Sequence, residues 1–324
     1  MNKRDVICVL LICSIVILCV ITIDLYTCPC HCYYPKTEIE QYLNETCESI
    51  RLNSENDTEK VHKIIAWENN ELGLTPFKAY QLHLRQRGGC SSPNKVYWYT
   101  YVGKGNCGER AIIFEDMAKR TGLKYRKIVI DGYIDPQKNY TDNRPDNHRW
   151  SEVWLNDNWR IADSGCNLSY PEDNLSYFTL EKGWLIGHVA ILYDNGTFGD
   201  RTDSYVNRAG KLIIQAVKDG ESIKDADVSI KLTYMNHPCS VVGGNNIKLS
   251  TNNSGLCEIS LGIYDSAYYM VKVSDKGIFY EYFGRENVTI ANETNYLVIE
   301  LDEHKVGVAI SKAMANFREN KKNV

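Results

Sequence analysis

The feature that most limits how this chain can fold is a pair of short apolar stretches around the turn Asn-Asp-Asn at 156–158. They cover residues 149–155 and 159–162 and are rich in Trp, Val, Leu and Ile. Strand-like runs joined by Asn and Asp predict an antiparallel hairpin. His148 begins the first strand and Asp163 ends the second, so we expect the two residues opposite each other at one edge of the sheet.

A cysteine stands upstream of this hairpin, in the glycine-flanked segment Gly-Asn-Cys-Gly-Glu at 105–109. The apolar spacing that follows predicts a helix over residues 107–121, ended by Gly122. Cysteine catalysis needs a thiolate, and an ordinary thiol is only a few per cent ionised at neutral pH. Because a helix N-terminus favours negative charge, Cys107 is a candidate nucleophile, and nearby N–H groups are candidates for an oxyanion hole.

Three segments together resemble the core of the transglutaminase-like superfamily, which includes transglutaminases, peptide N-glycanases and microbial thiol proteases. They are Gly-Asn-Cys-Gly-Glu at 105–109, His-Arg-Trp-Ser-Glu-Val-Trp at 148–154 and Trp-Arg-Ile-Ala-Asp-Ser at 159–164. The resemblance spans residues 57–165 and implies an α+β, papain-like fold with helices packed on an antiparallel sheet. It also implies thiol chemistry at an acyl or amide carbon. By motif, Cys107 is the nucleophile, His148 the base and Asp163 the acid that orients the histidine.

Several of these residues also have a structural interpretation. Cys107 alone would be read as a half-cystine, because that is the usual fate of an extracellular cysteine. We interpret Glu109 as a charge in the first helical turn, not as a general acid. His188, in an apolar setting, is an alternative base but fits a core histidine better, and the role of Glu152 stays open.

The aromatic residues near the motifs are expected to be mainly structural. Trp150 and Trp154 share one strand face and are interpreted as core residues, with substrate stacking as the alternative. Relatives use an upstream tryptophan to support the oxyanion. Trp98 and Trp67 are candidates, and that role stays unassigned. The polar loop at 135–147 is long, so we expect it to line the substrate cleft.

The expected function is hydrolysis of amide bonds in protein or peptide substrates by a cysteine protease or amidase. Hydrolysis is favoured over cross-linking because no feature marks an amine-acceptor site. The alternatives are a cross-linking acyl transferase and a non-catalytic module that binds cell-envelope polymers. No calcium loop or set of metal ligands is apparent, so no cofactor or metal is expected.

An unbroken apolar run at residues 6–23 predicts an N-terminal transmembrane helix. Lys3 and Arg4 precede it, which favours a cytoplasmic N-terminus and an extracytoplasmic body. We interpret the run as an uncleaved signal anchor, with a cleaved signal peptide as the alternative. The chain also has many acceptor sequons for N-glycosylation, at Asn44, Asn56, Asn139, Asn167, Asn174, Asn195, Asn252, Asn287 and Asn292.

The cysteine pattern is compatible with an oxidising compartment. Once Cys107 and the cysteines of the apolar run are set aside, eight remain, and eight can pair completely: Cys28, Cys30, Cys32, Cys47, Cys90, Cys166, Cys239 and Cys257. The stretch at 28–32 has single-residue spacing, so it is read as a disulfide-rich stalk, with metal binding as the alternative.

The expected domains are an anchor (1–27), a juxtamembrane stalk and helix (28–55), a catalytic domain (56–204), a small all-β sandwich (205–304) and a polar tail (305–324). Helices are also predicted at 37–50 and 59–72, and a strand at 125–130. The sandwich resembles carboxypeptidase regulatory-like modules, and a bridge between Cys239 and Cys257 is expected in it. Its strands are predicted at 211–217, 226–233, 247–251, 256–261, 268–273 and 296–301.

Charge gives no sign of a polyanionic partner. The 37 basic and 41 acidic residues are dispersed, and the net charge is −4. A nucleic-acid-binding protein would instead concentrate positive charge on one face. We therefore expect no nucleic-acid partner.

Overall fold

The computed structural model describes residues 14, 36–73, 92–138, 147–166, 168–244, 246–276, 280–291 and 293–306. The chain forms two compact units: unit 1 comprises residues 1–125 and 150–171, and unit 2 comprises residues 126–149 and 172–324. Apart from Ser14, the apolar run at 6–23 lies outside the described residues, as does the stalk at 28–32. Within the described ranges, no helix is both long and apolar enough to span a bilayer.

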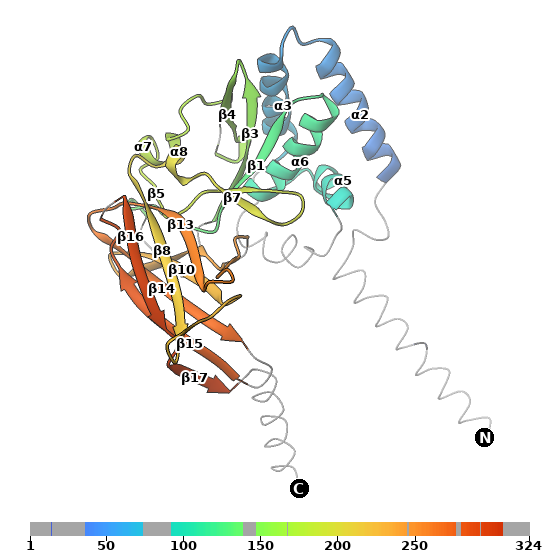
Figure 1. The fold of residues 1–324 in the computed structure, drawn as a ribbon. Helices are drawn as coiled ribbons and strands as arrows, with labels where there is room; N and C mark the ends of the chain where they lie inside the picture. The colour runs from blue at the N-terminus through green and yellow to red at the C-terminus, as the bar shows by residue number, and fades with distance from the viewer. Residues whose placement is uncertain are drawn as a thin grey trace, which may run out of the picture. The chain divides into compact units, whose positions relative to one another are not determined.

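The main helices of unit 1 are α2 (Lys36–Leu52), α3 (Asp57–Glu71), α5 (Ser92–Val102) and α6 (Cys107–Arg120) (Figure 1). Three of them, α2, α3 and α6, confirm the predicted helices at 37–50, 59–72 and 107–121. The sequence analysis missed α5. Its residues are mostly Val, Tyr, Trp and Thr, which are typical of strands, and only packing against the other helices makes the segment helical.

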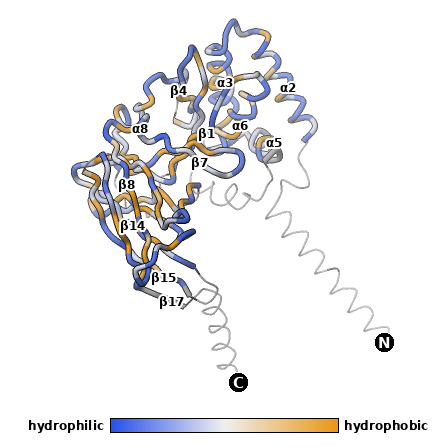
Figure 2. Tube along the Cα trace, in the orientation of Figure 1, coloured by the Kyte–Doolittle hydropathy of each residue, from blue (hydrophilic) through white to orange (hydrophobic). Residues whose placement is uncertain are grey.

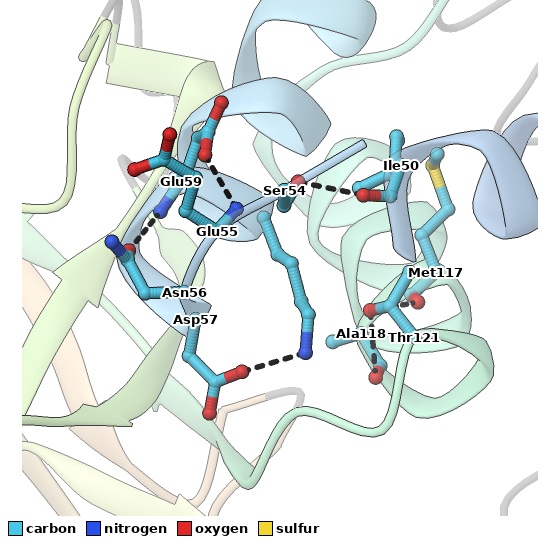
Figure 3. A network of polar contacts seen from close by, with 10 residues as sticks. Ile50, Ser54, Glu55, Asn56, Asp57, Glu59, Met117, Ala118 and Thr121 are labelled. Carbon is cyan, nitrogen blue, oxygen red and sulfur yellow. Dashed lines mark hydrogen bonds and ion pairs between the residues drawn. The ribbon is translucent and has the colours of Figure 1, made fainter. Parts of the chain in front are cut away.

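The connection between α2 and α3 is fixed by local hydrogen bonds (Figure 3). Asn56 caps α3, since its Oδ1 accepts from the backbone N–H of Glu59 at 3.0 Å. The Glu59 carboxylate in turn accepts from the N–H of Glu55 at 2.7 Å. At the end of α2, the Ser54 hydroxyl donates to the Ile50 carbonyl at 2.6 Å. These bonds satisfy backbone groups that helix ends leave without intrahelical partners.

The hairpin consists of β3 (His148–Leu155) and β4 (Asn158–Ala162), with register pairs from Ser151↔Ala162 to Leu155↔Asn158. Asn156 and Asp157 have φ of 49° and 63°, as a two-residue turn between twisted strands requires. The predicted hairpin is therefore confirmed. One hydrophobic cluster joins the helices to this hairpin. The strands of the hairpin contribute Val153, Leu155 and Ala162 to the cluster.

Unit 2 begins with β1 (Tyr125–Ile130), which confirms the strand predicted there, and β6 (Ala190–Leu192) pairs with both β1 and β7 (Phe198–Asp200). The short strands β2 (Tyr133–Ile134) and β5 (Leu185–Ile186) pair with each other. Two short helices complete this part, α7 (Tyr177–Leu180) and α8 (Thr202–Tyr205).

The rest of unit 2 is built from two further sheets. One has the order β11-β10-β14-β15-β17, with β12 beside β10; the other has the order β13-β8-β16, with β9 beside β8. Both sheets contribute to a single hydrophobic core. Along much of β8 and β14 buried residues alternate with more exposed ones, as expected for strands with one buried face. The tube in Figure 2 shows both hydrophobic and hydrophilic stretches in this region.

The strands predicted in this region are confirmed as six of the observed ones: β8 (Ala209–Lys218), β10 (Asp227–Tyr234), β12 (Leu249–Ser250), β13 (Leu256–Gly262), β14 (Ala267–Lys276) and β16 (Thr294–Glu300). The others were missed: β9 (Glu221–Ser222), β11 (His237–Val242), β15 (Tyr280–Val288) and β17 (Glu303–Val306). Charged residues and Gly284 interrupt the alternation in β15. The resemblance of this region to carboxypeptidase regulatory-like modules stays a prediction.

The expected bridge between Cys239 and Cys257 is wrong, because Cys257 is a free thiol. The Cys239 thiol, on β11, donates instead to the Tyr133 carbonyl at 3.4 Å, and Cys257 is buried on β13. Cys47 is also a free thiol, so the eight cysteines do not all pair. Burial raises the pKa of Cys47 to about 11 and that of Cys257 to about 12.

A buried carboxylate organises the loop after β11. Asp131 is 2% exposed and accepts from three backbone N–H groups. The donors are Gly244 at 3.0 Å, Asn246 at 2.7 Å and Ile247 at 3.2 Å. Burying a carboxylate is tolerated when such donors satisfy it, so Asp131 and the loop stabilise each other.

Candidate active site

Cys107 is the first residue of α6, and its thiol is free and half-buried. Asn106 precedes it as the N-cap, and its backbone N–H donates to Glu109 Oε2 at 2.9 Å. Gly105 makes this arrangement possible, because a Cβ there would lie 2.8 Å from the Cβ of Glu109. The predicted helix start is confirmed, and Glu109 acts as a cap of the first turn, as expected.

Asp163 follows β4 and leads into the short helix η3 (Ser164–Cys166). The Asp163 side chain is buried, and its Oδ1 accepts from the backbone N–H of Cys166 at 3.3 Å. This local bond fixes the carboxylate against the turn that carries it.

Gly165 lies close to both Cys107 and Asp163. A Cβ built on Gly165 would lie 2.9 Å from Cys107 Cα, 3.1 Å from Cys107 Cβ and 3.1 Å from Asp163 Oδ1. Real Cβ atoms essentially never approach a backbone atom that closely. The lack of a side chain at position 165 therefore allows η3 to pack directly on the first turn of α6.

Arg110, one helical turn after Cys107, makes hydrogen bonds to neighbouring elements. It is 4% exposed, and its Nη1 donates to Asn69 Oδ1 at 3.1 Å and to the Ser164 carbonyl at 3.4 Å. Its Nη2 donates to the Leu72 carbonyl. One guanidinium thus links α6 to the end of α3 and to η3.

Glu68 lies beneath the same region, on the buried side of α3, and is fully inaccessible to solvent. Burial raises its pKa to about 8, and the nearby charge of Asp163 acts in the same direction. The Ser164 hydroxyl and the Arg110 guanidinium act in the opposite direction. A carboxyl group in this setting is mostly protonated at neutral pH.

His148 is the first residue of β3, in unit 2, and is 5% exposed. Its ring meets Phe178 and Trp184 edge-on, with centroids 5.5 and 5.6 Å away. Phe178 and Trp184 are themselves stacked, with centroids 5.1 Å apart. This aromatic frame fixes the plane of the imidazole.

The register of the hairpin differs from the expected one. The paired ladder ends at Ser151↔Ala162, three residues after His148. Continuing the same register would place Asp163 opposite Trp150, with His148 two residues further along. β4 ends at Ala162 and the chain turns into η3, so His148 and Asp163 are not register partners, and the expectation that they face each other at one edge of the sheet stays a prediction.

Three other residues that the sequence singled out are buried. His188 is fully buried, with Nδ1 3.1 Å from the Ser260 carbonyl and 2.9 Å from Thr202 Oγ1, so it is a core histidine, as expected. Trp150 is fully buried and Glu152 is also inaccessible.

One tryptophan differs from the expectation, and the role of two others stays unassigned. Trp154 is only half-buried and meets Trp159 edge-on at 5.2 Å, with the Lys124 ammonium 4.5 Å above its ring, so its expected core role is wrong. Its position near the exposed hairpin turn explains this. Trp67 donates its indole N–H to the Tyr42 hydroxyl at 3.1 Å, so that N–H is already engaged in this structure. Trp98 packs in the helical core.

Among the described residues of unit 1, two possible metal ligands lie side by side after β4. An oxygen of Asp163 and Sγ of Cys166 lie within 4.8 Å of each other. The loop expected to line the substrate cleft lies largely outside the described residues, since 139–146 are not among them.

Sequence reasoning missed Arg110, Gly165 and Glu68. A signal existed for Glu68: Val61, Ile64 and Ile65 define the apolar face of α3, and Glu68 occupies the next position on that face. An acid at such a position is unusual and points to a buried polar site. No comparable signal marks Arg110 or Gly165.

Comparison with known proteins places this geometry in a family context. Residues 44–164 match the model of the transglutaminase-like superfamily, so this stretch is a transglutaminase-like domain. No curated protein matches the chain.

Solved structures include three similar proteins. A candidate cysteine protease from Cytophaga hutchinsonii is 18% identical, with a TM-score of 0.28, over 39% of this chain and 37% of its own. A TGase is 13% identical, with a TM-score of 0.28, over 40% and 31%. The red sea bream transglutaminase is 11% identical, with a TM-score of 0.34, over 78% and 58%. The chain thus covers less than two thirds of each of these structures.

Proposed function

We propose that the transglutaminase-like domain is a cysteine hydrolase that cleaves amide bonds with Cys107 as nucleophile, His148 as base and Asp163 as orienting acid. The observation that carries the proposal is the placement of a free thiol on the first turn of α6, directly against the turn that holds Asp163. A nucleophile, a base and an orienting acid in motif order are what thiol catalysis requires.

The reaction would proceed in two steps. His148 takes the proton of the Cys107 thiol, and the sulfur attacks the substrate carbonyl while backbone N–H groups at the start of α6 stabilise the oxyanion. The C–N bond then breaks, and His148 gives its proton to the leaving amine. Water, deprotonated by the same histidine, attacks the thioester and releases the acid, which regenerates the thiol. Asp163 keeps the imidazole in the reactive tautomer.

Hydrolysis is the preferred outcome, and a protein or peptide is the preferred substrate. Gly108 favours access to the acyl group, since a Cβ there would meet no atom of the described residues within 4 Å. Transfer to an amine would use the same acyl-enzyme and is the alternative. A binding module on the same fold would need none of the three catalytic residues.

The cellular setting belongs to the same proposal. The apolar run at 6–23, preceded by Lys3 and Arg4, supports a single-pass anchor with the body outside the membrane. The density of N-glycosylation sequons supports that orientation. Cell-envelope polymers are then candidate partners.

Alkylation of the full-length protein tests the catalytic proposal. Wild type and the variants Cys107→Ser and His148→Ala would be treated briefly with iodoacetamide near neutral pH and examined by mass spectrometry. Rapid modification of Cys107, slowed in His148→Ala, is expected, because only the wild type has a base for the thiol. The buried thiols Cys47 and Cys257 serve as internal controls and should stay unmodified while the protein is folded.

A matched histidine variant controls for non-specific effects. His62 lies on α3 and stacks on Tyr170 at 4.1 Å, and His62→Ala should leave the alkylation rate of Cys107 unchanged. The proposal fails if Cys107 reacts no faster than a free cysteine, or if both histidine variants react like wild type. An activated Cys107 would then be screened with peptides, in the presence and absence of a primary amine, to separate hydrolysis from transfer.

A further inference from the structure

Three unsatisfied polar groups from three elements lie around the buried side of the candidate site. Neither carboxylate oxygen of Glu68 has a hydrogen-bond partner among the described residues. The same holds, within that part of the chain, for Ser164 Oγ and Arg110 Nε. These groups come from α3, η3 and α6. Buried polar groups left in this state are costly, so their arrangement calls for an explanation.

The charges around Glu68 explain which protonation state the site favours. Within the part of the chain that the structure describes, the charged groups that face it are Arg110 from α6 and Asp163, which directly precedes η3. The Arg110 guanidinium is held in place by the carbonyls of Leu72 and Ser164 and by the side chain of Asn69. It therefore cannot shift to pair with a second carboxylate. One cation can balance one carboxylate, so a second ionised carboxylate here would be a buried, unpaired charge.

We propose that Glu68 is a positioning residue that is held as a neutral acid, leaving the charge of Arg110 to Asp163 alone. The inference rests on the proposed function, since it assigns Glu68 to the support of the acid that orients His148. Burial, which raises the pKa of Glu68 to about 8, agrees with this protonation state. Ionisation would release the proton to solvent and place a second negative charge beside Asp163.

Ionisation of Glu68 would disturb the position of Asp163 in the candidate site. A second carboxylate would repel Asp163 and compete with it for Arg110. Asp163 would then hold the histidine less firmly, and the reactivity of Cys107 would fall. Glu68→Gln keeps the shape of the neutral side chain but cannot ionise, so it should preserve the reactivity of Cys107 at neutral pH and remove its decline at alkaline pH.

The test compares the alkylation of Cys107 from pH 6 to pH 10 in the full-length wild type and in Glu68→Gln, Glu68→Ala and Glu71→Gln. Glu71 is exposed on the same helix and is the matched control. Wild type and Glu68→Gln should react alike below pH 7 and diverge above pH 8, where the wild type becomes slower. Glu68→Ala should be about tenfold slower throughout, as is typical when a supporting residue of a site is removed. Glu71→Gln should follow the wild type.

Infrared spectroscopy tests the proton itself, independently of any reactivity. At neutral pH, wild type should show a carboxylic acid C=O band that disappears above pH 8 and is absent from Glu68→Gln. Superimposable pH profiles for wild type and Glu68→Gln, or no such band, overturn the proposal. If the band is present but Cys107 of the wild type reacts no faster than a free cysteine, the proposed function fails while Glu68 is still shown to hold the proton.

Discussion

Gly165 lies against the backbone of Cys107 so closely that a methyl group on Gly165 would stand 2.9 Å from Cys107 Cα. Gly165→Ala must therefore push η3 away from α6, because a backbone atom cannot yield as a flexible side chain can. We expect a loss of roughly 1–3 kcal/mol in stability, the usual cost of overpacking. Cys107 should also be alkylated more slowly. Urea unfolding and alkylation rates measure the two effects.

Gly108→Ala is the control for that change, because it adds the same methyl group one residue after Cys107 in open space. It should stabilise α6 by up to about 1 kcal/mol, since alanine is the better helix former. Equal stability losses in the two variants would show that the close approach at Gly165 does not matter.

Glu68 should make the protein less stable as pH rises through the neutral range. Its folded-state pKa is raised to about 8 from a reference value of 4.5. Between these values the folded state holds a proton that the unfolded state has lost, so stability falls with rising pH. This contribution is complete below pH 4.5 and lost above pH 8. Urea midpoints at pH 5, 7 and 9 should decline less in Glu68→Gln than in wild type, and parallel declines would contradict the assignment.

His188 should act in the opposite pH direction. Burial lowers its pKa below 6.5, while Asp200 and the Ser260 carbonyl oppose the shift. On acidification the unfolded state takes up a proton before the folded state does, so stability contributed by the neutral ring is lost as pH falls below 6.5. Proton NMR of the histidine rings should show one resonance that titrates below pH 6.5 and vanishes in His188→Gln. A resonance of His188 that titrates above pH 6.5 would refute the prediction.

Asp131→Asn should loosen the loop after β11. The amide has one acceptor oxygen, whereas the carboxylate uses both oxygens to accept from three N–H groups. We expect a loss of about 1–3 kcal/mol, the usual cost of unsatisfied buried donors. Thermal unfolding measures it, and hydrogen exchange at Gly244, Asn246 and Ile247 should accelerate.

Asp225→Asn provides the comparison for Asp131. Asp225 is exposed and has a φ of 56°, which asparagine adopts readily, so this variant should unfold like the wild type. A similar loss in both variants would mean that the charge change alone is responsible.

The sequence predicted those elements whose local pattern and final environment agree. The helix that begins at Cys107 has a cap, an apolar face and a glycine stop, and all three are local. The turn at Asn156 and Asp157 is likewise specified by its own residues. By contrast, α5 carries residues typical of a strand and becomes helical only through packing, so no local rule could identify it.

The candidate site was predictable in its motif residues but not in their support. Arg110 acts through carbonyls at the end of α3 and in η3, and those groups meet only after the chain has folded. The point at which β4 ends and η3 begins lies beside the first turn of α6, at the close approach of Gly165 to Cys107. Such relationships between distant segments leave no periodic pattern in the sequence.

The link that Arg110 makes between α6, α3 and η3 also has a kinetic meaning. These elements are far apart in the chain, and contacts between distant segments form late because closing long loops costs entropy. Before they form, Cys107 behaves as an ordinary cysteine of an unfolded chain. In a refolding experiment with pulses of alkylating reagent, the time at which the alkylation rate of Cys107 departs from that of the unfolded chain should therefore report when η3 packs on α6.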